Sequence, residues 1–252
     1  MTRLNLTVDA DGIALVTLTH PPVNAMDAPL LEELAALFEG LATAPAVRAA
    51  VITGAGGIFS AGLDLKLVPQ LDRLGQRRLV EALNDCFGTL YAWPKPLVAA
   101  VNGHAIAGGL ILALCADRRI VADVPMQASL AEVRVGVTYP VAPLEIARSE
   151  LAPPTARRLV LLAETLDAHA AHALGVFDDH APAEALMSHA LAHARHDATL
   201  PPQAFAITKH ELRAPALARI EQARAGTGEP RLVAWLGDEM RRAAAAVLRR
   251  AA

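Results

Sequence analysis

The sequence has little net charge, few aromatic side chains and only two cysteines. A net charge of −3 over 252 residues leaves no excess of basic side chains to bind nucleic acid or an anionic membrane surface. Cys86 and Cys115 lie in apolar segments with helical spacing, so we expect free thiols in a reducing, cytoplasmic compartment. Hydrophobic residues, largely alanine and leucine, make up 54% of the chain and aromatics only 4%, which predicts a compact, helix-rich globular protein.

Long apolar runs are missing as well. Residues 1–8 alternate like a strand and lack the apolar stretch of a signal peptide. The apolar segment at residues 102–117 is interrupted by Asn102, His104 and several glycines, and it falls short of the roughly 18 to 20 continuous apolar residues that span a bilayer. We therefore expect neither a leader nor a membrane span.

Short apolar runs alternate with helical patterns along the first 200 residues. Runs at residues 4–8 and 13–19 flank a turn signal and predict a hairpin, and Asp27 is placed to cap a helix through residue 41. The other predicted elements are buried strands at 49–53, 97–101 and 119–122 and helices at 79–93 and 109–115. This alternation predicts an α/β core with parallel pairing over residues 1–200, followed by a helical capping or oligomerisation region over 201–252.

Two widely used motifs are incomplete. Phe59 occupies a position where the dinucleotide-binding pattern GxGxxG requires glycine. His189, His193 and His196 recur at helical spacing, but Ala190 stands where a zinc-protease motif needs glutamate. We therefore expect solvated histidines there and no metal site.

Two glycine-containing segments are candidates for a site lined by backbone amides. Gly62 permits a tight turn and leaves the following amide, that of Leu63, free to point into a cleft. Gly108 and Gly109 stand at the expected start of a helix, where the first amides have no partner within the helix and the dipole is positive. Taken separately, each segment is better explained as an ordinary turn, where small residues serve packing.

Together these segments resemble the crotonase family, the enoyl-CoA hydratase/isomerase superfamily. The matching stretches are Asn24-Ala25-Met26, Phe59-Ser-Ala-Gly-Leu-Asp-Leu-Lys66, Lys95-Pro-Leu-Val-Ala-Ala-Val-Asn-Gly-His-Ala-Ile-Ala-Gly-Gly109, Cys115-Ala-Asp-Arg-Arg-Ile120 and Glu132-Val-Arg-Val-Gly136, with Ala131 in place of the usual proline. The resemblance implies a spiral of ββα units with a C-terminal helical region, usually assembled as a trimer or a dimer of trimers. It also implies binding of acyl-CoA thioesters, with coenzyme A as part of the substrate and no separate cofactor.

The resemblance further assigns roles to individual residues. It implies that the backbone amides of Leu63 and Gly108 form an oxyanion hole for the thioester carbonyl. Leu63, Asp64, Leu65 and Lys66 would then lie along the coenzyme A, with Lys66 near a phosphate or the adenine side. A nucleotide-side contact for Lys209 is a weaker suggestion of the same kind.

The catalytic acids depart from the hydratase pattern. Typical hydratases carry two glutamates, because adding water needs one group to activate it and another to handle the second proton. Glu132 keeps the second position, whereas Ile111 occupies the first. One carboxylate suffices for a 1,3-proton shift, and an acyl pocket lined by Met26, Ile111 and Tyr139 would exclude water. The sequence is thus most like the single-glutamate Δ3,Δ2-enoyl-CoA isomerases.

Two alternatives remain open. The chain could be a hydratase or another acyl-CoA lyase whose second acid comes from elsewhere, although Glu145 and Glu150 align with no catalytic position. It could also be a catalytically silent acyl-CoA binder. RNA binding, known for some relatives, is disfavoured because the first predicted helix carries glutamates where basic residues would be needed.

Overall fold

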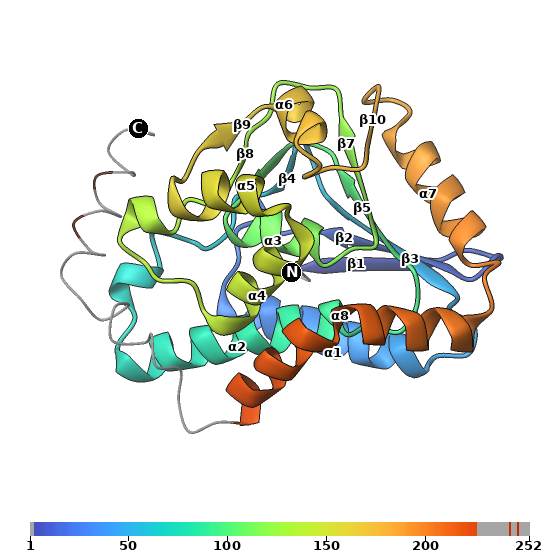
Figure 1. Ribbon diagram of the computed structural model, residues 1–252, viewed down its shortest axis with the longest axis horizontal. Coiled ribbons are helices and arrows are strands. Elements are labelled where there is room, and N and C mark those ends of the chain that lie inside the picture. The colour runs from blue at the N-terminus through green and yellow to red at the C-terminus, as the bar shows by residue number, and fades with distance from the viewer. Residues whose placement is uncertain (1–2, 226–241, 243–245, 247–252) are drawn as a thin grey trace.

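The computed structural model describes residues 3–225, together with residues 242 and 246. Its centre is a six-stranded sheet in the order β1-β2-β3-β5-β7-β10 (Figure 1). The strands are β1 Leu4–Val8, β2 Ile13–Leu18, β3 Ala49–Gly54, β5 Leu97–Val101, β7 Arg118–Ala122 and β10 Asp179–Ala181. Only β1 runs antiparallel to its neighbour, as the predicted hairpin requires, and the other strands of this sheet pair in parallel.

A second, smaller sheet has the order β4-β6-β8-β9. Its strands are β4 Ile58–Ser60, β6 His104–Ile106, β8 Ala128–Ser129 and β9 Thr165–Leu166. Each of β3, β5 and β7 in the large sheet is followed by a strand of the small sheet and then by a helix, so the ββα unit repeats. This repetition confirms the expected α/β fold with a crotonase-like spiral core.

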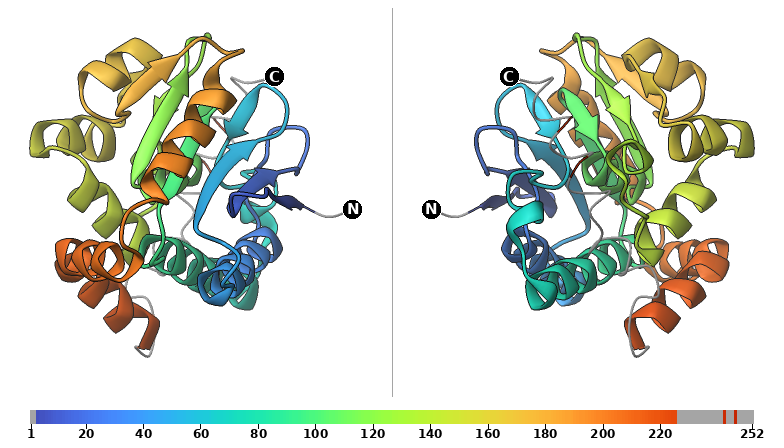
Figure 2. Two further views of the ribbon diagram at one scale, coloured as in Figure 1. Left: turned by 90° about the vertical axis from the view of Figure 1, so that its right-hand side faces the viewer. Right: turned by 90° about the vertical axis from the view of Figure 1, so that its left-hand side faces the viewer.

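Alternating side chains of the large sheet enter two separate cores. Ala50 and Ile52 of β3 belong to the main core, whereas Ala49 and Val51 pack toward helix α7, Leu186–Asp197. Strands buried on both faces read as continuous apolar runs, which is why the predicted strands lack an alternating pattern. Figure 2 shows α7, in orange, lying against the large sheet on the side away from the other helices.

The main core is closed by helices α1 Ala28–Thr43, α2 Arg73–Tyr91, α3 Gly108–Leu114 and α4 Val141–Glu150. Asp27 caps α1 as predicted, its side chain accepting from the Leu30 amide at 2.8 Å. Helix α2 begins before its predicted start at residue 79, because Asp72 caps it by accepting from the Gly75 amide. No described helix is long and apolar enough to cross a membrane.

Four further helices follow α4 in the described part of the chain, in addition to α7. They are α5 Pro153–Ala156, a π-helix Arg157–Leu161, α6 Ala168–Ala173 and α8 Pro202–Ala225. Helix α8 starts close to the predicted boundary at residue 200 and packs on α2 and α4 (Figure 1). The helix predicted toward residue 250 lies outside the described residues, except for residues 242 and 246.

Candidate functional site

The turn at Gly62 leaves the Leu63 amide without a partner. Leu63 forms an isolated parallel bridge with Met26, in which the Met26 amide donates to the Gly62 carbonyl at 2.7 Å and the Asp64 amide donates to the Met26 carbonyl at 3.1 Å. In this pattern the Gly62 carbonyl and the Asp64 amide bond to Met26. The Leu63 N–H, which lies between them, points away from Met26. Within the described chain it meets no acceptor.

The Gly108 amide is free for a different reason. Gly108 is the first residue of α3, and the amides of Leu110 and Ile111 already donate to the Ala107 carbonyl. Ala107 has a φ of 49°, a strained value for a residue with a side chain, and its own amide is held by the Ser129 carbonyl at 2.7 Å. The conformation of Ala107 sets the direction in which α3 begins. Among the described residues, the Gly108 N–H donates no hydrogen bond.

The two free amides belong to one small region. A Cβ atom added to Gly62 would lie 3.1 Å from the Gly108 nitrogen and 2.5 Å from the Ile106 carbonyl oxygen. The backbone of the turn therefore lies against the start of α3 with no room for a side chain between them. Two N–H donors held this close can serve one oxygen atom, which is the arrangement that stabilises a developing oxyanion.

A pocket of about 230 Å³ opens beside these amides. Apolar side chains dominate its lining, and the polar groups are few. The lining residues are Ala61, Leu63, Leu65, Val68, Ile106, Ala107, Gln127, Ser129, Ala131, Glu132, Arg134, Val135, Val137 and Thr165. Of these described lining residues, Glu132 is the only acid.

Glu132 is held at this pocket by its own backbone. Its carbonyl accepts from the amides of Val135 and Val137 at 3.1 and 3.0 Å, in a 3₁₀ turn over Val133–Val135. The residue is 9% exposed, and its Oε2 atom has no hydrogen-bond partner. Burial raises the pKa of Glu132 to about 7, although its own amide and the Tyr139 hydroxyl act in the opposite direction. A carboxyl group poised near neutral pH is suited to take up and return a proton.

The predicted apolar residues stand behind the pocket. Ile111 is fully buried in α3, Met26 is 1% exposed and Tyr139 is 5% exposed, and none of the three lines the pocket. The Met26 sulfur would lie 3.1 Å from a Cβ on Gly108, so Met26 supports the amide region from the inside. A direct contact of these three residues with an acyl chain stays a prediction.

The segment predicted to follow the coenzyme A forms an exposed turn. The Asp64 carboxylate accepts from the amides of Lys66 and Leu67 at 2.9 and 3.3 Å. Asp64 therefore shapes the turn, Leu65 lines the pocket, and the side chain of Lys66 is exposed at the surface.

Lys209 lies in a buried ion pair. It is 7% exposed, and its ammonium group lies 2.8 Å from the Asp117 carboxylate and donates to the Lys95 carbonyl. Burial lowers the pKa of Lys209, and Asp117 opposes that shift. The charge of Lys209 is engaged with Asp117 inside the protein, and a nucleotide contact of Lys209 stays a prediction.

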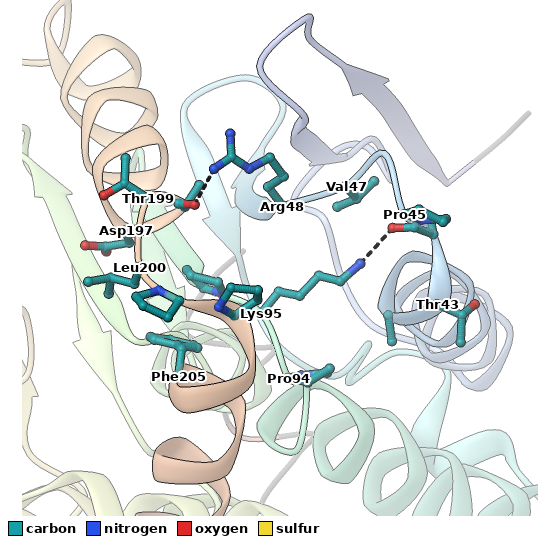
Figure 3. A pocket seen from close by; sticks show the side chains of 16 residues that line it. Thr43, Pro45, Val47, Arg48, Pro94, Lys95, Asp197, Thr199, Leu200 and Phe205 are labelled. Carbon is teal, nitrogen blue, oxygen red and sulfur yellow. Dashed lines mark hydrogen bonds between the residues drawn. The ribbon is translucent and has the colours of Figure 1, made fainter.

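A second hollow, of about 420 Å³, lies near the start of β5 (Figure 3). The Arg48 guanidinium there donates to the Ala198 carbonyl at 2.7 Å, and the Lys95 ammonium donates to the Leu41 and Ala44 carbonyls. Asp197 is paired with Arg118 at 2.8 Å. The charged groups of this hollow are therefore already bonded to other parts of the protein. Because they are engaged in this way, the hollow is a poor candidate for a catalytic site.

The histidine-rich segment lies in helix α7, within the described residues. Among the described residues, no group of three or more histidine, cysteine, aspartate or glutamate side chains is placed to hold a metal ion. Ser129 and Thr165, which line the pocket, were not predicted from the sequence, since their strands of two residues are too short to produce a periodic pattern.

Comparison with known proteins identifies the family. The family model described as enoyl-CoA hydratase/isomerase matches residues 9–232. The chain belongs to the enoyl-CoA hydratase/isomerase family. A putative enoyl-CoA hydratase of Thermus thermophilus is 33% identical over 209 residues, which cover 81% of this chain and 82% of the relative.

Solved structures are similar to most of the chain. The human mitochondrial Δ3-Δ2-enoyl-CoA isomerase matches with a TM-score of 0.91 and 27% identity, covering 99% of this chain and 98% of the human one. A Mycobacterium tuberculosis relative, 34% identical over 89% of this chain and 94% of its own, has a TM-score of 0.81 and is called a probable enoyl-CoA hydratase. A second structure, also 34% identical over 89% of this chain and covering 96% of that chain, has a TM-score of 0.80 and is called an enoyl-CoA isomerase from the same bacterium. The two Mycobacterium tuberculosis structures are of one protein, so the same protein carries both names.

Proposed function

We propose that this protein moves the double bond of an enoyl-CoA from C3 to C2 by a 1,3-proton transfer through Glu132. The observation that carries the proposal is the single acid among the described residues that line the pocket. Isomerisation removes and returns one proton, so one carboxyl group can perform both steps. Hydration requires a second group to handle the other proton, and the described lining offers no second carboxyl for it.

In the proposed reaction, the ionised Glu132 takes a proton from C2 of a 3-enoyl-CoA. The electron pair of that C–H bond delocalises into a dienolate, with the negative charge largely on the thioester oxygen. Protonated Glu132 then returns the proton to C4, which leaves the double bond between C2 and C3. Atoms and charge balance, and no further cofactor is consumed.

The amides of Leu63 and Gly108 are the proposed partners of the thioester oxygen. Both N–H groups can donate to the thioester oxygen because neither donates a hydrogen bond within the described chain. Because the charge on that oxygen grows only as the proton leaves, these donors stabilise the transition state more than the substrate. Loss of one comparable donor costs about 3 to 4 kcal/mol of barrier.

The proposal extends to the rest of the substrate and to assembly. The coenzyme A would follow residues 63–66, with the exposed Lys66 near its phosphates, since an ammonium group is a good point charge for phosphate. A homotrimer or a dimer of trimers is the proposed assembly, and the cytoplasm the proposed location.

The direct test offers purified protein 3-enoyl-CoA and 2-enoyl-CoA separately and identifies each product by chromatography and mass spectrometry. We expect the first substrate to give the 2-enoyl product, and Glu132→Gln to lower kcat by about a thousandfold. Glu145→Gln is the matched control, because Glu145 is 8% exposed on α4 and outside the pocket.

Other outcomes favour the alternatives. Efficient addition of water to 2-enoyl-CoA, together with slow isomerisation, would replace the isomerase by a hydratase, as the name of the Thermus relative suggests. Binding of both thioesters without turnover of either would favour a silent acyl-CoA binder.

A further inference from the structure

Two buried polar atoms beside the pocket have no hydrogen-bond partner. They are Oε2 of Glu132 and the hydroxyl oxygen of Tyr139, on residues that are 9% and 5% exposed. Leaving a buried polar group without a partner is unfavourable, so two of them at one site are not expected from packing alone.

A short, well-fixed loop connects the two residues. After the 3₁₀ turn, Gly136 has a φ of 67° and reverses the chain, and the Val137 amide donates back to the Glu132 carbonyl at 3.0 Å. Tyr139 then leads into α4, whose Ala142 amide donates to the Asn84 side chain at 2.9 Å. The loop is thus fixed at both ends, and the Tyr139 ring cannot move far without disturbing α4.

The electrostatics of the two groups depend on each other. Burial, together with the neighbouring Glu132 charge, raises the pKa of Tyr139 well above its ordinary value, so its hydroxyl keeps its proton. In return, the Tyr139 hydroxyl lowers the pKa of Glu132 against the larger effect of burial. Arg134 is the other charged side chain that lines the pocket, and its guanidinium donates to the Ala163 carbonyl. Tyr139 is therefore a permanent donor beside a carboxyl group that changes its charge.

We propose that Tyr139 is a positioning residue whose hydroxyl donates a hydrogen bond to one oxygen of ionised Glu132 and leaves the other oxygen to face the substrate. The proposal rests on the proposed function for its catalytic meaning, but the hydrogen bond it describes lies within the protein and can be tested without substrate. It also gives a role to an aromatic residue that the sequence suggested only as apolar lining. A carboxylate held by one oxygen presents the other in a fixed direction, which favours proton transfer at a defined carbon.

The test is Tyr139→Phe, which removes only the hydroxyl oxygen. Tyr91→Phe is the matched control, because Tyr91 is the only other tyrosine and its buried hydroxyl bonds to Glu150 at 2.8 Å, away from the pocket. The ionisation of Glu132 is followed in ligand-free protein by infrared difference spectroscopy, with Glu132→Gln to assign the carboxyl band. We expect Tyr139→Phe to raise the titration midpoint by about one pH unit, a tenfold change in the dissociation constant, and Tyr91→Phe to leave it unchanged.

The pH dependence of kcat/KM for 3-enoyl-CoA supplies the second measurement. In Tyr139→Phe the acidic limb of the profile should move upward by the same amount as the infrared midpoint. An unchanged midpoint overturns the positioning role, whatever the enzyme does with substrate. If Tyr139→Phe shifts the midpoint but the wild type turns over no 3-enoyl-CoA, the contact between Tyr139 and Glu132 is supported and the proposed function is contradicted.

A third measurement needs no change at Tyr139. Tyrosine labelled with ¹³C at Cζ gives two signals, and Tyr91→Phe identifies the one from Tyr139. We expect the Tyr139 signal to move with pH through the titration of Glu132 in the wild type and to stay constant in Glu132→Gln. A signal that is insensitive to pH in both proteins contradicts the contact, even if Tyr139→Phe fails to fold.

Discussion

Gly62 and Gly108 are in such close contact that a Cβ atom on Gly108 would lie 3.8 Å from the Cα atom of Gly62. In the opposite direction, a Cβ on Gly62 would lie 2.5 Å from the Ile106 carbonyl oxygen, where no side chain fits. Gly62 also has a φ of 74°, which disfavours any residue with a side chain. The position of the Leu63 amide therefore depends on the absence of a side chain at Gly62.

Gly62→Ala is accordingly expected to lower kcat by about a hundredfold, because the clash with Ile106 moves the Leu63 amide away from the thioester oxygen. Gly56→Ala is the matched control, since Gly56 has the same φ of 74° but no atom within 4 Å of an added Cβ. Steady-state kinetics on 3-enoyl-CoA would compare both variants with the wild type. Equal losses in the two variants would mean that backbone strain, and not the amide position, causes the effect.

Glu132→Gln should stabilise the protein at high pH. The pKa of Glu132 rises from an ordinary value of 4.5 to about 7 in the folded protein, so the folded state binds more protons than the unfolded state between these values. The wild type therefore loses stability as pH rises through this window, while glutamine stays neutral. Between about pH 5 and about pH 8, the stability of the variant relative to the wild type should increase by about 2 kcal/mol. Urea unfolding at the two pH values measures it, and a constant difference would contradict the raised pKa.

The large sheet and the capped helices were predictable because local patterns determine them. Residues 49–53 and 97–101 are continuous apolar runs, and the structure buries them on both faces as β3 and β5. Asp27 caps α1 through the hydrogen bond expected of that residue type. Such features depend on neighbours a few residues apart, so a single sequence contains them.

The pocket was only partly predictable because it depends on contacts distant in sequence. Gly62 and Gly108 suggested free amides, but only the structure shows that they lie together. The burial of the Tyr139 hydroxyl beside Glu132 has no counterpart in local spacing. The buried ion pair of Lys209 was not predictable for the same reason, since its partner Asp117 lies in the loop between α3 and β7, 92 positions away in the sequence.

Val135→Phe is expected to restrict the acyl chain. Val135 is 7% exposed and lines the pocket of about 230 Å³, so a larger side chain would fill space that the acyl group needs. We expect kcat/KM to fall about tenfold for medium-chain substrates and to change little for the shortest ones. Val133→Phe is the control, because Val133 is 50% exposed and does not line the pocket. If both substitutions change the chain-length profile equally, the acyl chain does not occupy this pocket.

Asp117→Ala should loosen the attachment of α8 to the core. The Asp117 carboxylate lies 2.8 Å from the Lys209 ammonium and 3.2 Å from the Arg213 guanidinium, and it accepts from the Leu97 amide at the start of β5. Removal of the carboxylate leaves the buried Lys209 charge unpaired, whereas Arg213 keeps Glu150 at 3.5 Å. We expect a loss of about 3 kcal/mol in the free energy of unfolding, at the low end for a broken buried pair.

Urea unfolding followed by circular dichroism measures this loss. Glu211→Ala is the control on the same helix, since the Glu211 side chain is 75% exposed and should change stability by less than about 0.5 kcal/mol. The double variant Asp117→Asn with Lys209→Met removes both charges and should recover part of the loss, because neither partner is then left as an uncompensated buried ion. An Asp117→Ala protein that unfolds at the same urea concentration as the wild type would show that apolar contacts alone hold α8 on α2 and α4.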